Sequence, residues 1–181
     1  MRNEIAQQVN IFKVYNDIAL KHEIVVFGGS YAAAFPFYEL AQKYLFSNAI
    51  YNRSIKELTL TEAEECLNDC VCEIHPDKLF LCLGEHDIGN AVATGAYRRI
   101  LRKLHSKLPK TQIYALPVFR EGAEIFNNEL RELCKTEGAE FLDIRYTLSG
   151  KPLPYGKIFK QLSRFFRKTP LTPAEAFSLG Y

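Results

Sequence analysis

One serine follows directly after a predicted buried strand, and a serine at such a place could carry nucleophilic chemistry. The apolar run Ile24–Phe27 is typical of a strand inside a parallel sheet, and the two residues Gly28 and Gly29 predict a sharp turn before a helix-prone segment. That turn would bring the Ser30 hydroxyl to the carboxyl end of the sheet and to the positive end of a helix. Either a nucleophile or an anion-binding group suits this place.

Three further segments place polar groups where chemistry could occur. Two of them follow predicted strands and the third lies near the carboxyl end of the chain. Ligands bind beyond the carboxyl ends of parallel strands, so these segments are the natural partners of Ser30. They are Asn52-Arg53-Ser54-Ile55, Gly84-Glu85-His86-Asp87 and Leu171-Thr172-Pro173-Ala174-Glu175.

The hydrophobic pattern between these segments alternates between strands and helices. It predicts strands at 23–27, 49–51, 78–83, 112–116 and 139–142. Helices are predicted at 32–44, 61–71, 90–108 and 123–136. An amphipathic helix over 5–20, with Asn3 as its candidate cap, precedes them, and a basic-aromatic helix over 157–167 follows a breaker-rich loop.

This order predicts an α/β protein with a three-layer α/β/α sheet of five parallel strands. Continuous apolar strands such as Leu79–Leu83 suit a parallel sheet that is covered on both faces. We expect one such domain over residues 23–181, with the helix of residues 1–22 packed on it.

Composition limits the classes of function. The chain has 181 residues, and 48% of them are hydrophobic, which is typical of a globular protein. Its formal net charge of +2 is too small to indicate that the whole molecule binds nucleic acid. No apolar run approaches the ~20 residues that span a bilayer, and the amino terminus has no apolar signal core, so a cytoplasmic location is expected. The basic-aromatic helix over 157–167 could lie on a membrane surface or a partner protein, but a covering helix for the sheet explains it better, so it gives no firm membrane signal.

Five cysteines are an odd number for a disulfide framework, and three of them lie near His75. Their spacing differs from that of paired zinc knuckles, and burial of Cys66 and Cys70 one turn apart on a helix explains them. We expect no metal and no cofactor. The arginine and lysine stripe on the helix over 90–108 is interpreted as a solvated face.

Taken together, the polar segments resemble the blocks of the SGNH (GDSL-type) hydrolases, a family of esterases and acyl hydrolases with a flavodoxin-like α/β/α fold. The resemblance covers roughly residues 23–181 in the right order and spacing, and leaves the leading helix outside. The family's first block is Gly-Asp-Ser, whose serine is the nucleophile. Ser30 matches that serine, and Gly29 stands where the aspartate would be.

The second block of the family reads Asn-x-x-Ile-x-Gly, and its glycine amide helps to bind the oxyanion. Asn52 matches, but Glu57 occupies the glycine position, where its bulk and negative charge are expected to oppose an oxyanion. In the third block, Gly-x-Asn-Asp, Gly84 and Asp87 match and His86 replaces the asparagine. The resemblance therefore implies a catalytic pair, Ser30 and His86, and substrate-binding positions at Gly29, Asn52, Glu57, Gly84 and Asp87.

The fourth block supplies the family's base as Asp-x-x-His, commonly followed by Leu-Thr-Pro. Residues 171–174 match that tail, but Pro170 stands at the histidine and Arg167 at the aspartate. Neither side chain can act as a general base, whose help is worth ~10²–10⁴-fold. Ordinary family chemistry is therefore expected to be impaired.

Alternatives remain for both residues of the pair. Ser30 could be no more than a helix N-cap. His86 could act as an unconventional base, oriented by a nearby carboxylate, or it could replace the asparagine as a neutral donor. The candidate orienting carboxylates are Glu85, Asp87 and Asp143.

Three functions follow from these observations. The first is a divergent hydrolase acting on a small ester or acylated ligand, with Ser30 as nucleophile and the Ser30 backbone amide as an oxyanion donor. The second is a catalytically inactive member of the family that binds a ligand or serves as a scaffold. The third is an anion-binding domain in which residues 28–30 hold a phosphate at the helix start.

Overall fold

The computed structural model contains one five-stranded sheet, all of whose strands are parallel, in the order β2-β1-β3-β4-β5. The structure describes residues 1–44, 48–144 and 154–166. The strands are β1 (Ile24–Gly28), β2 (Ile50–Asn52), β3 (Lys78–Cys82), β4 (Gln112–Ala115) and β5 (Glu140–Phe141). Each lies within two residues of its predicted place, so the predicted α/β fold class is confirmed.

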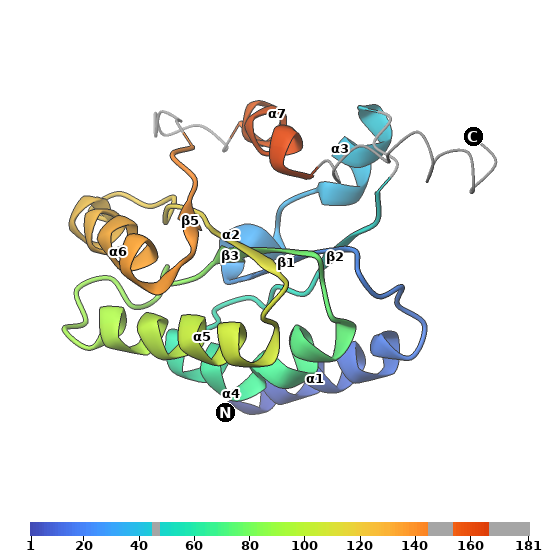
Figure 1. The fold of residues 1–181 in the computed structure, drawn as a ribbon, viewed down its shortest axis with the longest axis horizontal. Helices are drawn as coiled ribbons and strands as arrows, with labels where there is room; N and C mark the ends of the chain where they lie inside the picture. The colour runs from blue at the N-terminus through green and yellow to red at the C-terminus, as the bar shows by residue number, and fades with distance from the viewer. Residues whose placement is uncertain (45–47, 145–153, 167–181) are drawn as a thin grey trace.

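Helices cover both faces of the sheet (Figure 1). One face packs against α1 (Asn3–Asn16), α4 (Leu60–Cys70), α5 (Ala93–Lys107) and α6 (Glu124–Glu137). The other packs against α2 (Ser30–Ala33), α3 (Phe37–Lys43) and α7 (Tyr155–Phe166), and a 3₁₀ turn, η1 (Cys72–Ile74), follows α4. Successive β1 side chains alternate between these two cores, as the pleat of a strand requires.

Two helix predictions were wrong in their extent. The predicted helix 32–44 is two helices, because Pro36 has no N–H to donate and disfavours a helical conformation at Phe35. The leading helix ends at Asn16 instead of residue 20, and Asn3 is its first residue, while Arg2 holds the cap position without a side-chain cap. Residues 167–181, which include the predicted fourth block, lie outside the described residues.

The leading helix is part of the main core. Ile5, Val9 and Phe12 are each at most 4% exposed and join the cluster that also contains α4 and the sheet. The cysteines Cys66 and Cys70 are buried on α4, as the sequence predicted, and a hydrogen bond with Cys66, together with burial, raises the pKa of the Cys70 thiol. Within the described ranges, no group of three His, Cys, Asp or Glu side chains is placed to hold a metal ion.

The basic stripe on α5 faces acidic groups of its neighbours. Arg99 pairs with Glu64 of α4 at 2.9 Å, and Arg102 pairs with Glu137 of α6 at 2.8 Å. Arg99 and Arg102 therefore have acidic partners within the molecule, and such solvent-exposed ion pairs contribute little to stability. No helix in the described part of the chain is both long enough and apolar enough to cross a membrane.

Helix α4 begins with a capping box whose acidic member has a second partner. The Thr59 side chain accepts the Glu62 N–H, while the Glu62 carboxylate accepts from Thr59 and from the Arg2 guanidinium. The hydrogen bond from Arg2 is the main cause that lowers the pKa of Glu62 from 4.5 to about 2. Glu62 is 7% exposed, whereas the Arg2 side chain is about half exposed, so water partly screens the charges of this pair.

We expect Glu62→Gln to lower the free energy of unfolding by about 2 kcal/mol at pH 7, the scale of a hydrogen bond to a charged group. Because the folded-state pKa lies below the unfolded value, the contribution of Glu62 is complete above about pH 4.5 and is lost as the pH falls toward about 2. Urea unfolding of both proteins between pH 7 and pH 2 measures this. A difference between the two proteins that stays constant over that range would contradict the account.

Candidate active site

Three loops meet at the carboxyl edge of the sheet because β2, β1 and β3 are neighbours. The first turns from β1 into α2 and carries Ser30, the second joins β2 to α4, and the third follows β3 and carries His86. Gly28 allows the end of β1 to lie close to the end of β3, because a Cβ at this residue would lie 2.4 Å from the Cys82 carbonyl oxygen of β3. Ile55 N–H also donates to the Gly28 carbonyl at 2.9 Å, so the second loop is bonded to the first.

Ser30 and His86 lie in contact. The Ser30 Oγ atom is 3.0 Å from His86 Nε2, and the imidazole is exposed to solvent. Gly29 holds the N-cap position of α2 and Ser30 is its first helical residue, so the alternative in which Ser30 serves only as an N-cap is wrong. Among the described residues, the backbone N–H of Ser30 is paired with no acceptor.

The Glu57 main chain contacts the same serine. Its N–H donates to Ser30 Oγ at 2.9 Å, and its φ of +60° lies in the left-handed region that glycine adopts most readily. The Glu57 side chain is half exposed and its oxygens lie 3.8 Å from nitrogens of Arg2 and Lys56. The backbone at this position thus keeps the conformation that a glycine would supply, while the carboxylate pairs with cations.

Asn52 and Asp87 use their polar atoms within the protein. Asn52 Nδ2 donates to the Ala32 carbonyl of α2 at 2.8 Å, and its Oδ1 accepts the Ser54 N–H. Asp87 is 8% exposed and accepts the Leu60 N–H at 3.0 Å, and burial raises the pKa of its carboxyl group. Both side chains brace the loop between β2 and α4.

Gly84 serves the turn after β3. Its φ of +101° is left-handed, and a Cβ there would lie 2.4 Å from the Phe126 ring of α6. Only glycine fits both conditions, and the turn it allows leads the chain toward His86.

None of the three candidate carboxylates is hydrogen-bonded to His86. Within the described ranges, the only hydrogen bond of the imidazole is the one to Ser30. Glu85 and Asp87 accept backbone N–H groups of Tyr31 and Leu60, and Asp143, which is exposed just after the edge strand β5, lies 3.4 Å from Arg131. The expectation that one of them orients the imidazole is not met in this structure.

Sequence reasoning missed the role of Glu85. Its Oε2 accepts the Tyr31 N–H at 3.0 Å, so a carboxylate already occupies the amino end of α2. This contact argues against the third hypothesis, a phosphate at residues 28–30. A Cβ on Gly29 would lie 3.3 Å from the same oxygen, so Glu85 fills the space beside the position where the family has its aspartate.

We expect Gly29→Asp to lower the free energy of unfolding by about 1–3 kcal/mol, because a second carboxylate would be placed against Glu85. The backbone itself tolerates a side chain, since the φ of Gly29 is −87°. The double variant Gly29→Asp/Glu85→Ala should recover much of the loss, which thermal unfolding of the four proteins measures. If the stability losses of the two single variants simply add up in the double variant, the two carboxylates do not repel each other.

A groove borders the site on the side of the leading helix. Its volume is about 420 Å³, and it is lined by residues of α1, α2 and the loop after β2. Glu4 and Gln8 of α1 line it together with Ser54, Lys56 and Glu57 of the loop, so its walls carry mainly polar side chains.

Comparison with known proteins finds similarity in structure but none in sequence families. No family model matches the chain, and no curated protein matches it. A structure from Streptococcus pneumonia, provisionally named a platelet activating factor, superposes with a TM-score of 0.77 at 22% identity, covering 91% of this chain and 93% of that one.

Two further neighbours carry hydrolase names. A GDSL-like lipase from Bacteroides thetaiotaomicron gives a TM-score of 0.65 at 13% identity, over 87% of this chain and 95% of its own. The lipase/acylhydrolase from Enterococcus faecalis gives 0.61 at 12% identity, over 82% and 98%. The resemblance predicted from the sequence is thereby confirmed at the level of the fold: this chain has the fold of the GDSL-like lipases and acylhydrolases, the SGNH hydrolases.

Proposed function

We propose that this protein is a serine esterase or acyl hydrolase acting on a small ester or acylated ligand. The observation that supports this most is the 3.0 Å contact between Ser30 Oγ and His86 Nε2 at the carboxyl ends of β1 and β3. A serine hydroxyl is a weak nucleophile and needs a base at this distance. The fold of the lipase neighbours supports the class of reaction but not the substrate.

The directions of the hydrogen bonds around Ser30 allow its hydroxyl to act as a nucleophile. Because Glu57 N–H donates to Oγ, one lone pair of the hydroxyl is engaged and its single proton is available to His86 Nε2. Ser30 Oγ attacks the acyl carbon as its proton passes to Nε2. The oxyanion that forms is stabilised by the N–H groups of Glu57 and Ser30, and the proton then passes to the departing alcohol.

In the second half of the reaction, water replaces Ser30 as the nucleophile and hydrolyses the acyl-enzyme. His86 accepts a proton from water, the resulting hydroxide attacks the acyl carbon of the acyl-enzyme, and Ser30 regains its proton as the acid leaves. The Glu57 side chain does not oppose the oxyanion in this scheme, because its carboxylate pairs with Arg2 and Lys56. The volume and polar walls of the neighbouring groove favour a compact, polar ligand over a long acyl chain.

One observation favours a second candidate, a protein that binds its ligand without turnover. No carboxylate among the described residues orients His86, and a triad normally fixes its imidazole through such a contact. On this reading Ser30 and the two N–H groups would bind the acyl oxygen of a ligand that is never cleaved.

Hydrolysis of p-nitrophenyl acetate by the wild type and by Ser30→Ala separates the two candidates. The esterase predicts turnover in the wild type and, in Ser30→Ala, a rate reduced at least ~10³-fold toward the uncatalysed reaction. Equal rates in the two proteins, or no turnover by the wild type, would contradict the esterase and favour binding alone.

A further inference from the structure

Glu57 holds a backbone conformation that its own residue type does not favour. A left-handed φ of +60° is uncommon for a residue with a side chain, and persists only where the surroundings fix it. The residue is also exposed, so packing of its side chain cannot supply that constraint. A local turn, closed by the hydrogen bond from Leu58 N–H to the Ile55 carbonyl at 3.3 Å, supplies part of the constraint, and contacts from another part of the chain add to it.

Arg2 supplies contacts to both parts of Glu57. Its Nη2 donates to the Glu57 carbonyl oxygen, and its Nη1 lies 3.8 Å from Glu57 Oε2. The φ and ψ angles of a residue link its N–H to its own carbonyl. A guanidinium that fixes the carbonyl of Glu57 therefore limits the directions in which the Glu57 N–H can point.

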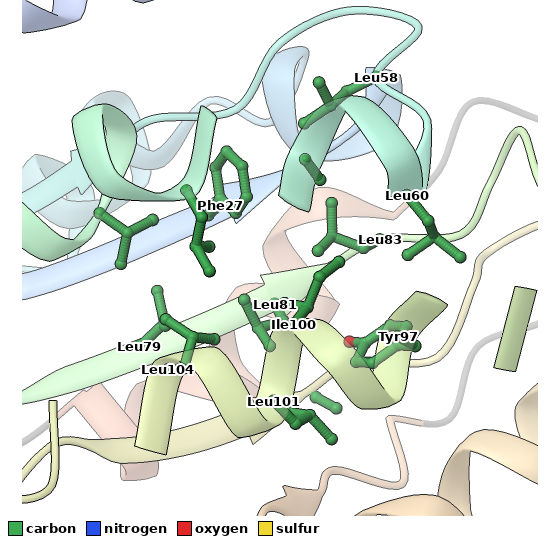
Figure 2. Packing of buried hydrophobic residues seen from close by; sticks show 14 of the residues in the cluster. Phe27, Leu58, Leu60, Leu79, Leu81, Leu83, Tyr97, Ile100, Leu101 and Leu104 are labelled. Carbon is green, nitrogen blue, oxygen red and sulfur yellow. The ribbon is translucent and has the colours of Figure 1, made fainter. Parts of the chain in front are cut away.

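The guanidinium is itself oriented by a buried carboxylate. Arg2 Nε and Nη2 each lie 2.8 Å from an oxygen of Glu62, a bidentate geometry that fixes the plane of the guanidinium. Glu62 is 7% exposed and also belongs to the capping box of α4. Next along the chain, Leu58 and Leu60 are buried in the core, as Figure 2 shows, so the loop is anchored on the far side of Glu57 as well.

We propose that Arg2 is a positioning residue, which holds the Glu57 peptide so that its N–H points at Ser30. Arg2 contacts Glu57 and Glu62 but not Ser30, so it acts through another residue. The inference rests on the proposed function in one respect, that the Glu57 N–H stabilises the oxyanion. It assigns a task to Arg2, the residue at the N-cap position of the leading helix α1.

The test compares Arg2→Met with Lys13→Met. Lys13 also joins α1 to α4 through an ion pair, to Asp69 at 3.3 Å, but does not contact the loop. Hydrogen exchange of the Glu57 amide, followed by NMR, should be about tenfold faster in Arg2→Met than in the wild type and unchanged in Lys13→Met, because only the first loosens the loop. Exchange at the wild-type rate in Arg2→Met would overturn the inference.

Activity gives a second readout that a general loss of stability does not reproduce. In Arg2→Met the kcat for p-nitrophenyl acetate should fall roughly tenfold, a fraction of the ~10²-fold cost of losing an oxyanion donor, with KM within about twofold. Lys13→Met should keep both constants. An unchanged kcat in Arg2→Met beside fast Glu57 exchange would overturn the link to the oxyanion.

The experiment also separates this inference from the proposed function. If the wild type has no Ser30-dependent activity, the proposed function fails and the exchange rate of the Glu57 amide alone decides the role of Arg2. If Arg2→Met does not fold because Glu62 is left buried without its partner, Arg2→Met/Glu62→Gln removes that charge and is measured in its place. It should show the same fast exchange, and slow exchange there would overturn the inference.

Discussion

His86→Ala is expected to slow Ser30-dependent ester hydrolysis by about 10²–10⁴-fold, the contribution of a general base. The expectation follows from geometry, since Nε2 lies 3.0 Å from Oγ and is the only described basic group in contact with the serine. The loss should appear in kcat, because the proton moves only as the reaction proceeds. Steady-state kinetics of the wild type and the variant measure it.

His86→Asn is the matched control, because it restores the side chain that the hydrolase family has at this position. An asparagine can donate a hydrogen bond but cannot accept the serine proton. If His86 is the base, His86→Asn should be as slow as His86→Ala. Activity near that of the wild type in His86→Asn would show that the imidazole acts as a neutral donor, and would remove the Ser30–His86 pair from the account.

Gly28→Ala is expected to lower the free energy of unfolding by about 3 kcal/mol, at the upper end of the range for overpacked sites. The new Cβ would lie 2.4 Å from the Cys82 carbonyl oxygen and 2.6 Å from Cys82 Cβ. Relief requires that β1 and β3 separate, because Gly28 and Cys82 are paired in the sheet. Chemical denaturation measures the loss.

The same separation should weaken the site, since Ser30 and His86 follow the two strands that would move. We therefore expect Gly28→Ala, where it is folded, to lose esterase activity as well. Gly95→Ala is the control: no atom lies within 4 Å of a Cβ there, and alanine should stabilise α5 by up to about 1 kcal/mol. A Gly28→Ala protein as stable as Gly95→Ala would contradict the close approach of the two strands.

The sequence was sufficient to predict the sheet and the place of Ser30. Parallel strands buried on both faces are continuous apolar runs, so Leu79–Leu83 and Ile24–Phe27 were recognisable without their partners. The turn at Gly28 and Gly29 indicated where the first strand ends. One of the two errors in helix extent, the single helix over 32–44, came from giving Pro36 less weight than the helix-prone residues around it.

The chemistry around Ser30 depends on contacts that a linear pattern does not show. The interpretation of Glu57 considered its side chain, whereas the structure brings its backbone N–H to the serine in a left-handed conformation. Arg2, 55 positions away along the chain, donates a hydrogen bond to the carbonyl oxygen of the same residue. Glu85 likewise reaches the Tyr31 N–H across 54 positions. Neither contact could be predicted from the hydrophobic periodicity of the sequence or from the spacing of a motif.

The central claim is that Ser30 is activated, and intact mass spectrometry after treatment with a fluorophosphonate tests it most directly. In an activated site, Ser30 Oγ forms a bond to phosphorus, fluoride leaves, and His86 takes the hydroxyl proton. We predict one phosphonyl adduct on the wild type and none on Ser30→Ala. A wild type that stays unlabelled, or an adduct that persists in Ser30→Ala, would contradict the account.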